Sequence, residues 1–164
     1  MGYAPTFIYS CGAPWLIVPL VAADEYSRHE DAIGKQADEL GLAQTVGTLP
    51  VGDHSVLVVP SESIAPSVEK YEGPLGRGSL PGLMLVLSGD ADSLELLYDN
   101  AGAWTPVGVF EVPSGPLCLV DSAVRPDFGA PAPPGHTLEV PAGAYEVFEF
   151  QSSNAHALWL QRPS

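Results

Sequence analysis

The sequence predicts an α+β fold of mostly antiparallel β-sheet, a sandwich or a partly closed barrel with one or two helices packed on it. Seventeen glycines and seventeen prolines in 164 residues divide the chain into short segments, which is typical of β-rich folds with many turns. Short apolar and β-branched runs lie between these turns. Only one stretch has the start signal, stop signal and spacing of an amphipathic helix. The length fits one domain, so we expect residues 1–164 to form a single domain.

The expected strands are short apolar or alternating runs. They are 6–9, 15–18, 43–49, 55–59, 83–87, 107–112, 117–120, 137–140, 145–150 and 157–160. The run 15–18 is continuously apolar, which predicts burial on both faces. The turn between 6–9 and 15–18 would allow these two strands to form a hairpin. We expect 55–59 to be a central strand, and Trp15 and Trp159 to lie in the core.

One helix is expected over 27–40. Ser27 and Glu30 have the spacing of a capping box, and Gly41 follows as a left-handed stop. Within it, one narrow apolar stripe is formed by Ile33, Ala37 and Leu40. The other face is acidic and carries Glu30, Asp31, Asp38 and Glu39. A second, shorter helix is expected near 91–99, and 60–82 is expected to be an irregular loop.

The charge balance is the strongest signal about partners. Twenty Asp and Glu stand against six Lys and Arg, for a formal net charge of −14. Such a chain repels nucleic acid and anionic membrane and attracts a basic partner. A high net charge also keeps proteins dissolved without steering any partner, and this alternative stays open.

The sequence has neither a signal-peptide pattern nor an apolar run long enough for a spanning helix, so we expect a cytoplasmic protein. The run 15–23 is short, contains Pro19 and has no basic residue before it. Cys11 and Cys118 are far apart and are expected to be buried free thiols, although one bridge between them remains open.

No catalytic or metal-binding pattern is present. None of the four histidines has the spacing to another that a zinc site needs. The chain has no G-x-S-x-G elbow, and the glycine-rich tract 73–82 lacks the ending of a phosphate-binding loop. A nucleophilic pair of Cys11 with a distant histidine remains open, but packing of a small residue at a turn is the preferred interpretation of Cys11. We therefore expect no catalytic residue, no metal and no cofactor. Trp104 lies in an expected turn, where an exposed indole would be a binding anchor, although partial burial under a loop is the commoner outcome.

Three segments resemble the immunity protein 21 family. They are residues 7–19, with a small-Gly-x-Pro turn and an aliphatic run, 114–123, with Gly-Pro-Leu followed by Asp-Ser-Ala, and 140–147, with a Pro-x-Gly-x-Tyr-x-Val pattern. The resemblance implies a bacterial immunity protein, which binds and blocks a toxin and is not an enzyme. Asp121 and Ser122 have a structural interpretation as well, since Asp-Ser after a strand is a good Asx turn or cap.

The leading hypothesis is a protein that neutralises a cognate toxin, which the acidic surface predicts to be basic. The candidate partner-binding residues are Glu30, Asp31, Asp38, Glu39, Trp104 and Asp121. The long 60–82 loop is a further place to look for a contact. A second hypothesis is a small cofactor-free β-barrel enzyme, such as a cyclase or isomerase acting on a hydrophobic small molecule. A third is a structural or regulatory module with neither pocket nor toxin.

Overall fold

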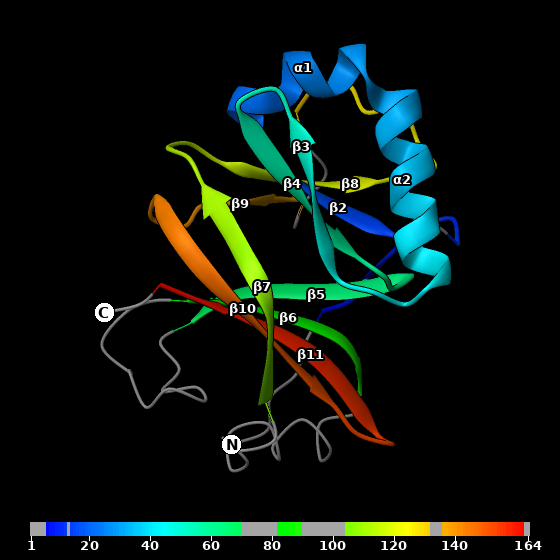
Figure 1. The fold of residues 1–164 in the computed structure, drawn as a ribbon, viewed down its shortest axis with the longest axis vertical. Helices are drawn as coiled ribbons and strands as arrows, with labels where there is room; N and C mark the ends of the chain where they lie inside the picture. Colours follow the sequence, from blue (N-terminus) through cyan, green and yellow to red (C-terminus); the bar gives the residue numbers. More distant parts are fainter. Residues whose placement is uncertain (1–5, 13, 70–81, 90–103, 132–135, 163–164) are drawn as a thin grey trace. The chain divides into compact units, whose positions relative to one another are not determined.

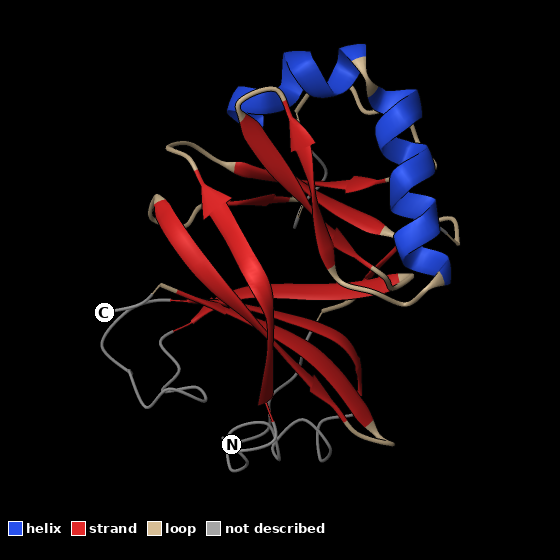
Figure 2. Ribbon diagram, viewed as in Figure 1, coloured by secondary structure: helices blue, strands red, loops and turns tan. Residues whose placement is uncertain are grey.

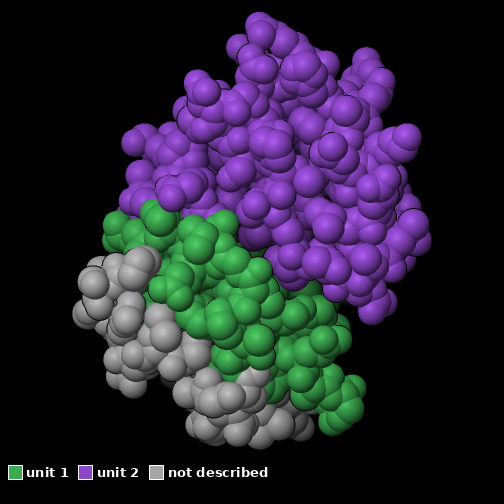
Figure 3. All heavy atoms as spheres, in the orientation of Figure 1, with its two compact units in different colours: residues 1–8, 63–109, 144–164 green, residues 9–62, 110–143 purple. Residues whose placement is uncertain are grey.

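The residues that the structure describes fold into antiparallel sheets and two α-helices, which confirms the α+β prediction (Figures 1 and 2). The computed structural model describes residues 6–12, 14–69, 82–89, 104–131 and 136–162. It contains two compact units, coloured separately in Figure 3. Unit 1 comprises Met1–Ile8, Ser63–Val109 and Ala144–Ser164, and unit 2 comprises Tyr9–Glu62 and Phe110–Gly143. The single domain over 1–164 stays a prediction.

A five-stranded antiparallel sheet forms the centre of unit 2. In spatial order it contains β3 (Gly47–Val51), β4 (His54–Val59), β2 (Trp15–Pro19), β8 (Leu117–Asp121) and β9 (Thr137–Leu138). Every residue of β2 is buried, as its continuous apolar run predicts. The strand 55–59 is indeed internal, since β4 lies between β3 and β2.

The expected hairpin between 6–9 and 15–18 is wrong. Residues 8 and 9 form β1 (Ile8–Tyr9), which joins the six-stranded sheet next to β5 (Ser63–Glu69). Strand β2 instead pairs with β4 and β8. An apolar strand flanked on both sides gains more burial than a hairpin partner would supply.

The helical region of unit 2 begins earlier and has a break. A 3₁₀ turn (η1, Leu20–Ala22) leads into α1 (Ala23–Arg28), and α2 (Glu30–Leu42) follows after His29. The capping box is therefore wrong, because Ser27 lies inside α1 and no side chain caps α2. The first turn of α1 carries Asp24 and Glu25, whose charges stabilise a helix N-terminus through the macrodipole.

The end of α2 also differs from the prediction. Gly41 lies within the helix, and Gln44 takes the left-handed conformation with φ 53°. The amide of Gln44 donates to the carbonyl of Gly41, and the amide of Thr45 donates to that of Leu40. This is a Schellman ending, three residues beyond the glycine.

The predicted apolar stripe of the helix is confirmed. Ile33 and Ala37 are buried, and Leu40 packs against the same cluster. Their partners on the sheet are Leu16, Val18, Val56, Val58 and Val120. The helices of unit 2 thus cover one face of its sheet (Figure 2).

The six-stranded sheet lies mostly in unit 1. Its spatial order is β1, β5, β6 (Gly82–Gly89), β11 (Ala155–Gln161), β10 (Gly143–Gln151) and β7 (Trp104–Val112). Its core contains Met84, Val86, Trp104, Phe148, Phe150, Ala157 and Trp159. Both tryptophans expected to be buried are confirmed as such: Trp159 is 0% exposed in this sheet, and Trp15, in β2 of the other sheet, is 2% exposed.

The expected loop over 60–82 is partly wrong, and the helix expected near 91–99 cannot be compared with the structure. The stretch 60–82 is not irregular throughout, because residues 63–69 form β5. Pro66 is compatible with this strand because the flanking β1 is only two residues long, so that β5 is close to an edge strand, where proline is tolerated. Residues 70–81 and the helix expected near 91–99 lie outside the described residues.

Candidate binding site

Two segments that the sequence singled out meet in unit 2. Asp121, at the end of β8, accepts a 2.9 Å hydrogen bond from the amide of Cys11 on Oδ2, and another of 2.9 Å from the amide of Ala123 on Oδ1. The amide of Ser122 donates to the carbonyl of Pro14 at 3.2 Å. The Asx-turn interpretation of Asp121 is therefore confirmed. Its carboxylate also joins two segments that are 110 residues apart in the chain.

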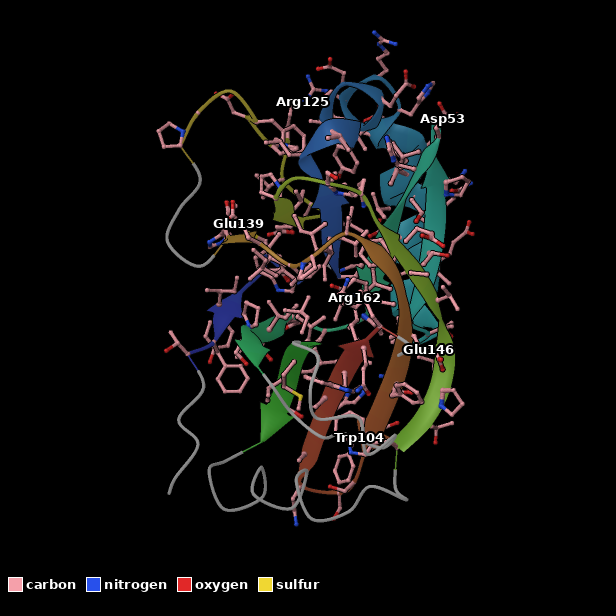
Figure 4. All side chains as sticks on the ribbon, turned by 90° about the vertical axis from the view of Figure 1, so that its left-hand side faces the viewer. Asp53, Trp104, Arg125, Glu139, Glu146 and Arg162 are labelled. Carbon is pink, nitrogen blue, oxygen red and sulfur yellow. The ribbon has the colours of Figure 1, made fainter. Side chains whose placement is uncertain are left out.

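Residues 121–125, which we call the Asp121 turn, lie against helix α2. The Arg125 side chain pairs with Glu30, with 2.5 Å between Nε and Oε1. Gly34 faces the carbonyl of Ser122, at a distance where a Cβ would make ordinary contact. Figure 4 shows Arg125 beside the helical segment of unit 2. The turn is thus held both by β8 and by the helix.

An apolar pocket of about 540 Å³ borders the Asp121 turn. Its lining includes Trp15, Leu20, Val124, Phe128 and His136, which all belong to unit 2. The Trp15 ring lies edge-on to His136, with 5.7 Å between the ring centroids. Its volume falls in the range of small-molecule sites.

A second hollow borders the same turn at Ala123, and we call it the acidic hollow. It has a volume of about 600 Å³, and its lining includes Cys11, Asp38, Leu42 and Glu62. No lysine, arginine or histidine is among its lining residues in the described part of unit 2. Two carboxylates without a lining cation make this hollow a place where a basic side chain is favoured.

Two groups at or beside the apolar pocket have raised pKa values. The pKa of Tyr26 is raised to about 12, first because its phenol is buried and then because Glu30 and Asp121 disfavour the phenolate. Burial also raises the pKa of the Cys118 thiol, which lines the pocket. This shift keeps the thiol protonated, opposite to what an activated nucleophile needs.

The cysteines are free, but only partly as expected. Cys118 is half-buried, whereas Cys11 is exposed. The reason is local, because Cys11 follows the two-residue β1 and lies in a bend rather than inside a strand. Burial of Cys11 is therefore a wrong prediction.

The predicted site residues do not all lie together. Asp31, Asp38 and Glu39 are exposed on α2, and Glu30 on the same helix is mostly buried under Arg125. Trp104 opens strand β7 rather than lying in a turn, and its side chain is 6% exposed in the core of the six-stranded sheet. Its ring packs on Phe150 at 5.5 Å between centroids (Figure 4 labels Trp104), so it offers no surface anchor.

Sequence reasoning missed Val124 and Phe128 as parts of a site, and it included Glu62 only as a member of the 60–82 loop. Glu62 directly precedes β5, in a stretch expected to be irregular, and the other two follow β8 in or before a proline-rich loop. The only available signal was that long loops carry function more often than strands do. Phe128 forms part of the pocket wall because its ring packs edge-to-face on Tyr26, with 5.9 Å between the ring centroids.

The described residues contain neither a membrane-spanning helix nor a cluster of metal-binding side chains. The described helices include none that is both long and apolar enough to cross a bilayer. Among the described side chains, no group of three or more His, Cys, Asp and Glu could hold a metal ion. The chain matches no protein-family model, no curated protein and no solved structure.

Proposed function

We propose that this chain is an immunity-type binding protein, which neutralises a cognate bacterial toxin with a basic surface by direct contact. The observation that carries the proposal is the combination, within unit 2, of exposed carboxylates on α2, an acidic hollow and an apolar pocket. Protein interfaces combine a polar rim with an apolar centre in this way.

The resemblance to the immunity protein 21 family supports the same function. Its opening segment contains Cys11 and Gly12, and its Asp-Ser-Ala segment contains Asp121. These two segments are joined by the hydrogen bond from Cys11 to Asp121. Residues of these two segments border the hollows of unit 2, since Trp15 and Asp121 line the apolar pocket and Gly12 and Ala123 line the acidic hollow.

Three polar groups at the apolar pocket favour binding over catalysis. Both carboxylate oxygens of Asp121 accept backbone amides, and Arg125 is paired with Glu30. The neighbouring Cys118 thiol has a raised pKa. General acid–base work needs a group aimed at the substrate with a pKa near the working pH. For this reason we prefer the toxin-binding function to the small-molecule enzyme.

The net charge of −14 contributes mainly to the rate of association. Opposite charges on two proteins speed their encounter, and salt weakens this effect. Exposed carboxylates at the rim of an interface change the association rate more than the dissociation rate. The exposed Asp38 and Glu39 side chains of α2 are therefore the first residues to test.

The test coexpresses the chain with the protein encoded by the neighbouring gene and measures complex formation by co-purification and surface binding. We expect a complex whose association rate falls at least about tenfold in the D38K/E39K variant and at high salt. The matched control is E111K/E139K, which makes the same charge change at two other exposed positions. Absence of any complex, or equal losses in both variants, would contradict the proposal.

A further inference from the structure

Exposed apolar side chains gather around the apolar pocket. Tyr9, Leu20 and Val124 line it and are 72%, 39% and 50% exposed. Leu42, which is 89% exposed, lines the acidic hollow. Exposed apolar surface that gathers at a hollow, rather than being scattered singly, marks an interaction site.

The inner wall of the apolar pocket is already fixed. Trp15 is 2% exposed, and its indole N–H donates to the carbonyl of Glu62 at 3.2 Å. Phe128 is held edge-on against Tyr26, and the amide of Leu119 donates to the carbonyl of His136 at 2.9 Å. A preformed wall keeps the ordering cost of binding small.

The charges near this pocket indicate the chemistry of what enters it. Asp121 and Asp127 line the pocket together with Arg125. The charge of Arg125 is compensated by Glu30, and the acidic hollow adds Asp38 and Glu62 beyond Ala123. Burial, Glu30 and Asp121 together raise the pKa of Tyr26 to about 12. A partner segment that has an apolar side chain next to a positively charged one therefore matches this pocket better than a neutral or acidic segment.

We infer that the apolar pocket receives one aromatic or branched aliphatic side chain of a basic protein partner, while Asp38 and Glu62 of the acidic hollow bind a lysine or arginine from the same segment. The inference rests on the proposed function for the nature of the partner. Interfaces concentrate their binding energy in such anchors, where one large side chain fills a pocket and polar contacts surround it.

The test uses a synthetic peptide, acetylated and amidated, with the sequence Lys-Ser-Trp-Ser-Lys. Its binding to the ¹⁵N-labelled full chain is followed by amide chemical shifts. We expect shifts at Leu20, Val124 and Ala123, and affinity at least about tenfold weaker when alanine replaces tryptophan or glutamate replaces both lysines. Equal binding of the alanine peptide would overturn the anchor. Equal binding of the glutamate peptide would overturn the basic partner and indicate a site for neutral apolar molecules.

Matched variants locate the contact. The L20S/V124S variant is expected to lose at least about tenfold in affinity for the tryptophan peptide. The control V107S/V109S makes the same kind of change at residues that are 36% and 55% exposed and outside this pocket, and we expect its affinity to be unchanged. Thermal unfolding of both variants verifies that they are folded. Equal affinities of the two variants would overturn the inference.

The peptide assay contains no toxin, so its failure can be told apart from failure of the proposed function. A toxin complex that L20S/V124S leaves unaltered would reject the anchor pocket and leave the proposed function standing. Peptide binding at the pocket without any toxin complex would reject the proposed function. It would retain the pocket as a site for apolar, cationic segments.

Discussion

Gly82 lies directly under the indole of Trp159 in the six-stranded sheet. A Cβ at this position would lie 2.3 Å from Cη2 and 2.4 Å from Cζ2 of that ring, and 2.8 Å from the carbonyl oxygen of Leu160. Because Trp159 is fully buried, the ring has nowhere to move. We predict that Gly82→Ala lowers the free energy of unfolding by about 3 kcal/mol, measured by urea denaturation.

Gly108 provides the control for this substitution, because no atom lies within 4 Å of the place where its Cβ would be. Gly108→Ala should change stability by about 0.5 kcal/mol or less. If Gly82→Ala were equally mild, the close contact between Gly82 and Trp159 would be disproved.

Tyr26 gives the fold a dependence on alkaline pH. Its folded-state pKa of about 12 lies above the ordinary value of 10 because of burial, Glu30 and Asp121. Above pH 10 the unfolded chain therefore loses this proton while the folded chain keeps it, and stability falls as the pH rises from 10 towards 12. We predict a steeper loss between about pH 10 and about pH 12 for the native chain than for Tyr26→Phe. The prediction would be contradicted if the denaturation midpoints of the native chain and of Tyr26→Phe fell equally with pH.

Single residues of the candidate site were only partly predictable. Asp121 was interpretable as a turn residue because Asp after a strand bonds local amides, and that bond exists. Its second bond, to Cys11, is a long-range contact that no local pattern encodes. Trp104 was misjudged because Gly and Pro nearby indicated a turn, whereas packing on Phe150 draws the indole into the core.

Helix α2 carries an interior glycine whose replacement should strengthen it. A Cβ on Gly34 would lie 3.8 Å from the carbonyl oxygen of Ser122, an ordinary van der Waals distance. Alanine is favoured over glycine inside helices by about 1 kcal/mol. We predict that Gly34→Ala raises the free energy of unfolding by about 0.5–1 kcal/mol, measured by urea denaturation.

The matched control for this helix is Gly41→Ala. Its Cβ would lie 3.2 Å from the Pro14 ring, so part of the gain in helix propensity is lost to crowding. We expect a smaller change than for Gly34→Ala. A loss of stability in Gly34→Ala would mean that the Asp121 turn packs more tightly on α2 than the distance to Ser122 indicates.

Elements were more predictable than their ends. Strands β2, β4 and β6 are predictable because continuous apolar runs suit internal strands, and burial confirms this. The helix start was missed because Ser27 and Glu30 imitate a capping box, whereas the helix begins at Ala23 without any side-chain cap. The strand expected at 43–49 begins only at Gly47, since the Schellman ending at Gln44 occupies the preceding residues.

The division into two units could not be predicted from the sequence. Linkers are recognised as polar, Pro- and Gly-rich stretches between continuous domains. Here unit 1 consists of three separate segments and unit 2 of two, so the chain has no single boundary to find. The site predicted from the sequence is incomplete for a similar reason. Residues near 11, 38, 62 and 123, which are far apart in the chain, line one hollow.

At the scale of the whole molecule, charge repulsion opposes folding. The net charge is −14. Two of the ion pairs between described residues, Arg28 with Glu25 and Arg125 with Glu30, have an exposed arginine and contribute little. Salt therefore screens more repulsion than attraction. We predict that raising NaCl from about 0.02 M to about 0.3 M raises Tm by about 2–4 °C, equivalent to about 1 kcal/mol.

Sodium chloride is the salt to use, because sulfate strengthens apolar burial by itself and would raise Tm whatever the charge. The variant E111K/E139K replaces two exposed negative charges by positive ones, so its Tm should depend less on NaCl than that of the native chain. A Tm that falls with NaCl would mean that local ion pairs outweigh the overall repulsion. The acidic surface would then stabilise the fold. It would not be a charge that opposes folding and is kept for binding a partner.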